Sequence, residues 1–271
     1  MDLSQTLEFV TKSDVGMVRA SNEDAVYANP VCGLAILADG MGGYNAGEVA
    51  SDMATTLLGR RLEAAFARLG QRRSGGDGRR LVQSALAAEI AHANSAVYSA
   101  AQSQPEYAGM GTTLVMALFH GDSLTVAHIG DSRLYRLRGR KLQLMTRDHS
   151  LLQEQLDRGL LSQEQARHAE NRNLVTRALG VDPNVEPEIN DFDTRAGDLY
   201  LLCSDGLNDM VEDEEIGTIL RRRSNDLEQA AAQLVQRAND SGGRDNVSLI
   251  LVRIRRAAVP GWLSSLFARF K

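Results

Sequence analysis

Four aspartates of this 271-residue chain each lie at the edge of a short apolar run and within two residues of a glycine. A buried carboxylate is costly to desolvate unless a partner compensates for its lost hydration. One such aspartate could simply cap a helix or close a turn. Four at equivalent places are better explained if they converge on shared cations. They are Asp39 after LAILA, Asp131 after LTVAHIG, Asp205 after LYLLCS and Asp245 before NVSLILV.

The ligand type indicates which metal such a site would hold. A site made of oxygen ligands suits Mg²⁺, Mn²⁺ or Ca²⁺, whereas zinc normally recruits histidine or cysteine. The five histidines include no pair at the H-x-H or H-x-x-x-H spacing. Two hard cations ~3.5–4 Å apart can ionise a water and clamp a phosphoryl group. The aspartates therefore favour hydrolysis at phosphorus.

The glycine-rich stretch LADGMGGYNAGE, residues 37–48, raises a nucleotide-binding alternative. From Gly42 it has the glycine spacing of a P-loop, but Glu48 and Val49 replace the lysine and the Ser/Thr of that motif. A carboxylate at the lysine position would repel phosphates. Glycines do allow a main-chain carbonyl to come close to a metal. The stretch is therefore better suited to holding metal than nucleotide.

The N-terminal stretch DVGMVRASNEDA places Arg19 four residues before the pair Glu23 and Asp24. Arginine binds phosphate through two parallel hydrogen bonds, so Arg19 is a candidate phosphate ligand. In isolation, the same spacing would favour a surface salt bridge. Here it directly precedes a segment that could form a strand beside residues 33–39.

The elements that must position these residues are short strands and long amphipathic helices. Short apolar runs predict strands, and their adjacent hairpins favour mostly antiparallel sheets. A polar stretch at 147–180, with short helical pieces, is expected to lie outside the sheets. The predicted strands are 33–39, 113–119, 123–131, 198–205, 246–254 and a hairpin over 132–145. The predicted helices are 46–69, 79–103, 212–222 and 225–239, with a loop over 71–78.

Composition limits the classes of protein that fit. The length is compatible with one large domain, and 43% hydrophobic residues suffice for its core. A net charge of −5 argues against nucleic-acid binding, which needs a basic surface. Cys32 and Cys203 are expected to be buried, reduced thiols of a cytosolic protein. We find no signal peptide and no run near the ~18 apolar residues of a membrane span, so we expect a cytoplasmic protein.

The last residues, 255–271, read as a separate amphipathic tail. After Pro260, five large apolar side chains fall on one face of a predicted helix. They are Trp262, Leu263, Leu266, Phe267 and Phe270. So short a helix is not stable alone and must dock on something. It could dock on its own domain. Alternatively, residues 260–271 could contact a membrane surface or a partner protein.

Taken together, these stretches resemble the metal-dependent protein phosphatases, or type 2C serine/threonine phosphatases, in their bacterial form. The matching stretches occur in family order over roughly residues 8–254. They are DVGMVRASNEDA, LADGMGGYNAGEVAS, GMGTTL, AHIGDSRLY, LMTRDHSLL, NLVTRALG, LCSDGL and GGRDNVS. The resemblance implies an α+β fold, a four-layer α/β/β/α sandwich of two antiparallel sheets flanked by helices. It also implies a catalytic domain over 1–254, with a flap subdomain at 147–180.

The resemblance also implies a role for each site residue, with two or three Mn²⁺ or Mg²⁺ ions per chain. Asp39 would bridge two metals and Gly40 would offer its carbonyl to one of them. Asp205 and Asp245 would bind the other, and Asp131 with Asp205 would hold a third, weaker metal. Arg19 would bind the substrate phosphate, and Arg19, Asp39 and Asp205 would be the catalytic residues. Glu23 and Asp24 would act through metal-bound waters, and Asn246 would support the site.

The sequence departs from the family at the residue that could protonate the leaving group. Family members commonly carry a histidine directly after the first D-G or after G-M-G-G, where this chain has Met41 and Tyr44. Tyrosine, with a pKa near ~10, is a poor proton donor at neutral pH. Either a metal-bound water protonates the leaving group or turnover is slower. If Tyr44 matters little, we expect reduced sensitivity to the pKa of the leaving group, and a large loss in Tyr44→Phe would contradict that.

The predicted function is a monomeric serine/threonine protein phosphatase. It would hydrolyse phosphoserine and phosphothreonine with a metal-activated water, and so reverse a bacterial Ser/Thr kinase. Its partners would be phosphorylated proteins and that kinase, with no nucleic acid. Two alternatives remain open: a phosphoprotein-binding pseudophosphatase and a phosphohydrolase of small molecules. Neither cysteine begins a C-x5-R motif, which argues against a cysteine-dependent phosphatase.

Overall fold

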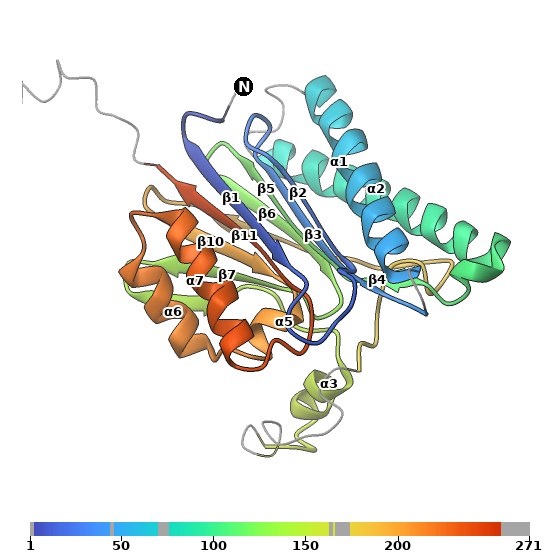
Figure 1. The fold of residues 1–271 in the computed structure, drawn as a ribbon. Coiled ribbons are helices and arrows are strands. Elements are labelled where there is room, and N and C mark those ends of the chain that lie inside the picture. The colour runs from blue at the N-terminus through green and yellow to red at the C-terminus, as the bar shows by residue number, and fades with distance from the viewer. Residues whose placement is uncertain (1–2, 44–45, 70–75, 163–164, 166–173, 256–271) are drawn as a thin grey trace, which may run out of the picture.

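Two antiparallel sheets, packed face to face, form the centre of the molecule (Figure 1). The computed structural model describes residues 3–43, 46–69, 76–162, 165 and 174–255. One sheet has five strands in the order β1-β11-β10-β7-β8. The other has six, in the order β2-β3-β5-β6-β9, with β4 paired to β3. None of the helices that the structure describes is both long and apolar enough to span a membrane.

The strands are short and follow the apolar runs of the sequence. In the five-stranded sheet they are β1 (Leu7–Asp14), β11 (Val247–Ile254), β10 (Leu199–Cys203), β7 (Arg133–Arg138) and β8 (Lys141–Leu144). In the six-stranded sheet they are β2 (Asp24–Asn29), β3 (Leu34–Met41), β4 (Gly111–Thr112), β5 (Leu114–His120), β6 (Ser123–Ile129) and β9 (Glu188–Asp193).

Long helices cover the outer face of each sheet, which makes four layers (Figure 1). Helices α1 (Ala46–Leu69) and α2 (Gly76–Ser103) pack on the six-stranded sheet. Helices α6 (Asp213–Arg222) and α7 (Leu227–Asp240) pack on the five-stranded sheet. The shorter helices are η2 (Pro105–Tyr107), α3 (Leu151–Asp157) and α5 (Asp205–Asn208). The predicted α/β/β/α sandwich is confirmed.

Strand β3 shows why its sequence is apolar at almost every position. Successive side chains of a strand point to opposite faces. Leu34 and Ile36 therefore pack toward the helices α1 and α2, whereas Ala35 and Leu37 pack between the two sheets. Both faces of the strand are buried, so the run lacks the polar alternation of a surface strand.

Besides the two-residue strand β4, the strands β1 and β9 were not predicted from the sequence, and both of these lie at sheet edges. β1 reads LEFVTKSD and β9 reads EINDFD, and both carry charged residues at exposed or half-buried positions. An edge strand pairs on one side only and tolerates such residues. Their hydrogen-bonding registers with β11 and β6 are continuous, so long-range pairing, not apolar periodicity, defines them.

Two details of the predicted helices and loops were wrong. Helix α2 begins at Gly76, so the end of the loop expected at 71–78 is helical. The stretch NRNLVTRALG, read as a helical piece, is not helical where it is described, because Val175 pairs with Ser150 and Leu179 with Thr112. The tail beyond residue 255 lies outside the described residues.

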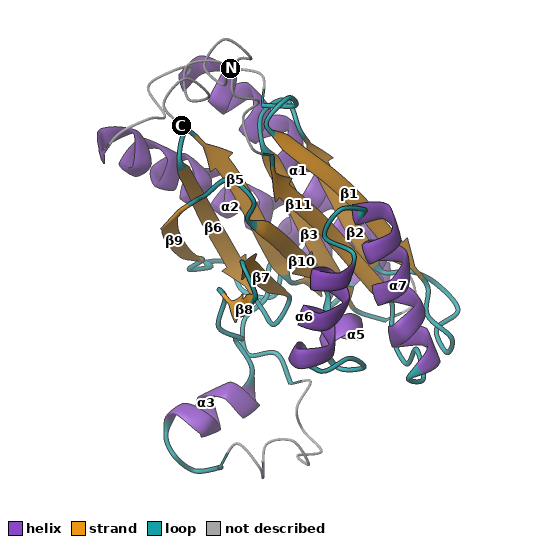
Figure 2. Ribbon diagram, turned by 90° about the vertical axis from the view of Figure 1, so that its left-hand side faces the viewer, coloured by secondary structure: helices purple, strands orange, loops and turns teal. Residues whose placement is uncertain are grey.

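The described parts of the polar segment 147–180 leave the sandwich and return to it at one place. Helix α3 stands away from the sheets in both views (Figures 1 and 2). The two ends of the segment are joined by main-chain hydrogen bonds, from Leu151 N–H to Leu174 O at 2.9 Å and from Thr176 N–H to His149 O at 2.8 Å. This base lies next to the turn that carries Asp131, because His149 N–H also donates to Gly130 O at 2.9 Å.

Candidate metal centre

The four strand-end aspartates meet at one end of the sandwich. Asp39 lies near the end of β3, and Asp131 and Asp205 each follow the last residue of a strand by two positions. Asp245 precedes β11, which runs antiparallel to β10, so its start lies beside the end of β10. A hollow of about 450 Å³ opens here. Its lining includes Arg19, Glu23, Asp39, Gly40, Asp131, Asp205 and Asp245.

Four carboxyl groups at this end, those of Asp24, Asp39, Asp131 and Asp205, hold their protons more tightly than free aspartates do. Burial, then the charges of Asp24, Asp205 and Asp131, raise the pKa of Asp39 well above its usual value. Burial and neighbouring carboxylates likewise raise the pKa of Asp205. Burial raises the pKa of Asp24 to about 6, and burial with the charge of Asp148 raises that of Asp131 to about 7. Crowded carboxyls of this kind need either protons or cations.

The donor set fits hard divalent cations. Oδ1 of Asp24 and Oδ1 of Asp131 are buried, and neither accepts a hydrogen bond from the residues that the structure describes. Buried polar atoms are otherwise almost always paired, so these two oxygens are open to a ligand. Several carboxylates and a nearby main-chain carbonyl make the oxygen environment that Mg²⁺ and Mn²⁺ take.

The main chain around Asp39 is fixed by neighbours, independently of its carboxyl group. Asp39 N–H donates to Oγ1 of Thr113 at 3.0 Å, and Thr113 N–H donates back to Asp39 O at 2.8 Å. The Thr112 hydroxyl also donates to Asp39 O, at 2.9 Å. Both threonines belong to the stretch GMGTTL. Their role could not be predicted, because their hydroxyls bond the main chain of a strand more than 70 residues away.

Glycines are needed where main chains cross beside the aspartates. A Cβ at Gly40 would overlap the carbonyl group of Gly47 and lie 2.7 Å from Glu23 O. A Cβ at Gly206 would overlap the carbonyl oxygen of Asn246. The same reason therefore explains the glycine in both D-G pairs, 39–40 and 205–206. In each pair the residue after the aspartate lies directly against another segment of main chain.

We expect Gly206→Ala to lower the free energy of unfolding by ~1–3 kcal/mol, the usual cost of overpacking. The added methyl group would overlap the carbonyl oxygen of Asn246, the residue just before β11, and must displace it. Urea unfolding at fixed Mn²⁺ checks this. Gly43→Ala is the control, because a Cβ there has no neighbour within 4 Å. Equal losses in the two variants would contradict the close-approach account.

Arg19 lies at the rim of the hollow and pairs with a predicted metal ligand. One guanidinium nitrogen is 2.7 Å from Oδ2 of Asp245, and the Arg19 side chain is 49% exposed. Oδ1 of Asp245 accepts from the N–H of Asn246 at 2.8 Å. The guanidinium thus sits where a phosphate held over the acidic hollow would meet it. Arg19 thus pairs with Asp245, 226 residues away, and not with the acids four residues on that its spacing suggested; its role as a phosphate ligand stays a prediction.

Of the three predicted supporting residues, Asn246 holds the N-terminal loop in place. Oδ1 of Asn246 accepts from Glu23 N–H at 2.8 Å, and its amide group donates to Val15 O at 3.0 Å and Ser21 O at 2.9 Å. Asp24 pairs with Asp39 in the β2–β3 register, and its Oδ2 accepts from the Ser204 hydroxyl at 2.8 Å. Asn246 thus acts on the loop that carries Arg19.

Two further acids act on the site and were missed from the sequence. The charge of Asp209 raises the pKa of Asp205 and of Asp131. It lies one helical turn after Asp205, and its N–H donates to Asp205 O at 2.8 Å. The D-x-x-x-D spacing in SDGLND was the available signal. Asp148, which also raises the pKa of Asp131, is neutralised by Arg133 at 2.6 Å.

Of the two positions without the family histidine, one is described. Met41 ends β3 and lines the hollow, where a thioether cannot donate a proton. Tyr44 lies outside the described residues.

The metal-free protein should lose stability as pH rises from about 4 to 8. Asp24 and Asp131, with folded pKa values of about 6 and 7, bind protons in the folded chain at pH values where the unfolded chain has lost them. Their contribution is full below the unfolded pKa of ~3.9 and is lost as pH passes the folded values. Thermal unfolding in EDTA measures it. In Asp131→Asn the decline should be shallower, and an unchanged slope would contradict this.

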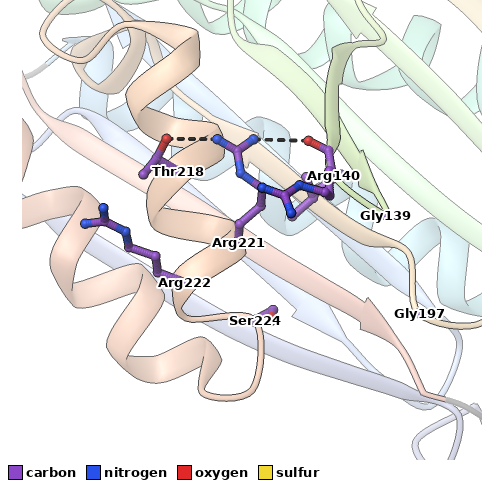
Figure 3. A pocket seen from close by; sticks show the side chains of 8 residues that line it. Gly139, Arg140, Gly197, Thr218, Arg221, Arg222 and Ser224 are labelled. Carbon is purple, nitrogen blue, oxygen red and sulfur yellow. Dashed lines mark hydrogen bonds between the residues drawn. The ribbon is translucent and has the colours of Figure 1, made fainter.

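A larger hollow, of about 610 Å³, lies at the opposite end of the five-stranded sheet (Figure 3). The described residues that line it include three arginines and no carboxylate: Leu137, Gly139, Arg140, Gly197, Thr218, Arg221, Arg222 and Ser224. The guanidinium of Arg221 donates to Arg140 O at 3.1 Å and to the Thr218 hydroxyl at 2.8 Å. Cationic side chains exclude a metal here, so metal chemistry belongs to the acidic end.

Comparison with known families agrees with the fold and the acidic site. Residues 18–251 match the protein phosphatase 2C family. This chain belongs to that family.

The relatives that it resembles are bacterial serine/threonine phosphatases. It is 41% identical over 248 residues to serine/threonine protein phosphatase PstP of Mycobacterium tuberculosis, covering 92% of this chain and 45% of that protein. The chain thus spans less than half the length of this relative. It is 37% identical over 247 residues to serine/threonine phosphatase stp of Listeria welshimeri, covering 89% of this chain and 93% of the other.

Solved structures share the whole architecture. A crystal structure of M. tuberculosis PstP has a TM-score of 0.81 at 40% identity and covers 93% of this chain and all of the other. A structure of the PstP catalytic domain in complex with two manganese ions has a TM-score of 0.77 at 40% identity, covering 93% and 99%. Stp1 from Staphylococcus aureus has a TM-score of 0.83 at 36% identity, covering 94% and 98%.

Proposed function

We propose that this chain is a metal-dependent serine/threonine protein phosphatase, with residues 1–254 as its catalytic domain. One observation carries the proposal: four strand-end aspartates crowd into one hollow, where the pKa values of Asp39, Asp131 and Asp205 are raised and Oδ1 of Asp131 has no partner among the described residues. An arginine lies at the rim of the same hollow. The names of the bacterial relatives support this activity.

The proposed ligands divide as the family resemblance implies. Asp39 would bind both of two Mn²⁺ or Mg²⁺ ions. Gly40 O and the carboxylates of Asp205 and Asp245 would be further ligands of these two ions. Asp131 with Asp205 would hold a third ion. Two cations held there would lower the pKa of a water for attack on phosphorus and offset the charge of the phosphoryl group. The relative crystallised with two manganese ions supports this choice of metal.

The chain's own side chains would bind and orient the substrate. Arg19 would exchange its ion pair with Asp245 for two hydrogen bonds to the phosphate, which places the phosphorus over the acids. Asn246 would hold the Arg19 loop, and Glu23 and Asp24 would order the waters of the site. Since Met41 cannot donate a proton, the leaving alkoxide would take its proton from water.

The biological setting follows from the same proposal. The substrates would be phosphorylated proteins, and the enzyme would reverse a bacterial Ser/Thr kinase as a cytoplasmic monomer. Segment 147–180, whose helix α3 stands off the sandwich, would act as a flap that influences access to the site. Residues 255–271 would form a docking tail, either on this domain or on a membrane surface or partner. Every predicted metal ligand is present in the chain, which argues against the pseudophosphatase alternative.

Hydrolysis of p-nitrophenyl phosphate and of a phosphothreonine peptide, each with Mn²⁺ or with EDTA, tests the proposal. We expect turnover of both with Mn²⁺ and none with EDTA. Turnover of small phosphate esters without peptide hydrolysis would favour the small-molecule alternative. No turnover in folded protein that binds Mn²⁺ would refute the catalytic proposal.

A further inference from the structure

A pair of buried histidines lies beside the metal centre without belonging to it. The rings of His128, on β6, and His149, at the base of segment 147–180, stack with centroids 4.8 Å apart and planes 19° apart. Their side chains are 1% and 8% exposed. Glu188, which pairs with His128 in the β6–β9 register, places an oxygen 3.7 Å from Nε2 of His149.

The hydrogen bonds of the two rings determine which nitrogens carry protons. Nδ1 of His149 accepts from Gly130 N–H at 3.2 Å, so in the neutral ring the proton is on Nε2, which lies near Glu188. Nε2 of His128 lies 2.8 Å from the carbonyl oxygen of Arg147 and must donate to it. Burial, then the charge of His128, lowers the pKa of His149 to about 4, so the ring is neutral at pH 7.

This protonation pattern argues against reading the cluster as a zinc site, although two histidines and a glutamate lie within ligand distance of one another. A metal on Nε2 of His149 would need a lone pair there while Nδ1 also uses its lone pair for Gly130 N–H. A neutral imidazole has only one such lone pair. The cluster instead matches a structural role for an uncharged ring.

His149 is joined to the turn that precedes Asp131 by two bonds. Gly130 N–H donates to the His149 ring, and His149 N–H donates to Gly130 O at 2.9 Å. Gly130 has a φ of +101°, and a Cβ there would lie 2.8 Å from the Thr113 side chain, so only glycine fits. His149 O meanwhile accepts from Thr176 N–H on the returning chain. One residue therefore connects the Asp131 turn to both ends of segment 147–180.

We propose that His149 is a positioning residue: its Nδ1, by accepting the Gly130 amide, fixes Asp131 for metal binding and ties segment 147–180 to that ligand. The proposal rests on the proposed function for the identity of the metal. No other acceptor among the described residues is bonded to the Gly130 amide, so removing Nδ1 leaves a buried N–H unpaired. The turn would then relax, and the Asp131 carboxylate would move with it.

Two substitutions separate hydrogen bonding from packing. His149→Asn keeps an acceptor, because its Oδ1 takes the place of Nδ1, but loses the ring. His149→Phe keeps the ring and loses the acceptor. Direct Mn²⁺ titration by electron paramagnetic resonance and hydrogen exchange of the Gly130 amide are the readouts. We expect His149→Phe to weaken the Asp131-dependent Mn²⁺ site by ~10-fold and to lose Gly130 protection, whereas His149→Asn keeps both close to wild type. Asp131→Asn identifies which binding step depends on Asp131.

The opposite order, with phenylalanine close to wild type and asparagine impaired, would show that packing alone matters and would overturn the proposal. Wild-type protein offers a second test if a variant does not fold. A long-range ¹H–¹⁵N spectrum should show His149 protonated on Nε2 only, and a proton on Nδ1 would also overturn it. Both readouts are independent of turnover, so an inactive wild-type enzyme would refute the proposed function and leave this test intact.

Discussion

Asp39→Asn is expected to abolish Mn²⁺-dependent hydrolysis, with a loss of more than ~10³-fold in kcat. Asp39 is proposed to bridge both metals, so asparagine removes one charged ligand from each. Metal contributes several kcal/mol of charge stabilisation in a phosphoryl transition state, and each ~1.4 kcal/mol is a factor of ten. The fold should survive, because Thr112 and Thr113 bond the main chain of residue 39, not its carboxyl group.

The same substitution should stabilise the protein when metal is absent. Asp39 is buried among other carboxyls, which raise its pKa, so at pH 8 the wild-type cluster carries unfavourable like charges. Asparagine removes one of them, and thermal unfolding in EDTA at pH 8 should shift upward. With saturating Mn²⁺ the order should reverse, because wild type gains more binding free energy.

Asp52→Asn is a matched control, since Asp52 is an exposed aspartate of α1 away from the hollow. It should alter neither turnover nor unfolding. Activity of Asp39→Asn within ~10-fold of wild type would show that residue 39 is no bridging ligand. A variant less stable than wild type in EDTA would contradict the account of repulsion among the carboxyls.

Much of the fold could be predicted because the central strands are apolar on both faces. β3 and β5 are apolar at nearly every position, and the apolar periodicity that predicted a helix at 79–103 matches the face of α2 that packs on the sheet. β1 and β9 could not be found in this way. Each has a polar sequence and is defined by its partner strand, and pairing across more than 60 residues leaves no local signal.

The acidic site was predictable for a related reason. An aspartate at the end of a buried strand is conspicuous in the sequence, and the antiparallel order brings the ends of β3, β6 and β10 and the start of β11 together. The structure places all five predicted ligands on one hollow. Which residue plays which part there stays a prediction.

The supporting contacts could not be predicted, because they join distant segments. Asn246 holds residues 15–23 from the other end of the chain, and His149 reaches Gly130 through a ring nitrogen. Neither contact joins residues at a fixed distance along the sequence, because a loop of any length can return to the end of a strand. Buried carboxylates that need a cation can therefore be recognised in the sequence. Side chains that hold a distant main-chain segment by hydrogen bonds cannot.

Arg19→Ala is expected to reduce kcat/KM for a phosphothreonine peptide by about 10- to 100-fold while leaving Mn²⁺ binding intact or tighter. Two charge-assisted hydrogen bonds to phosphate, each worth roughly 1.5–3 kcal/mol when fully formed, would replace the ion pair with Asp245, so the net loss is smaller than their sum. Mn²⁺ should not bind more weakly, because Arg19 occupies Oδ2 of Asp245, and its removal frees that oxygen for the cation. Steady-state kinetics and direct Mn²⁺ titration measure the two effects separately.

Arg19→Lys should recover little of the loss, since an ammonium group cannot offer the paired N–H donors of a guanidinium. Arg222→Ala, an exposed arginine at the basic hollow of the opposite end, controls for the loss of surface charge and should leave kcat/KM unchanged. If Arg19→Ala weakened Mn²⁺ binding and peptide hydrolysis together, the arginine would be organising the metal site through Asp245. If it changed neither, the ion pair with Asp245 would be a surface salt bridge without a part in binding, and the phosphate would have to be held by metal alone.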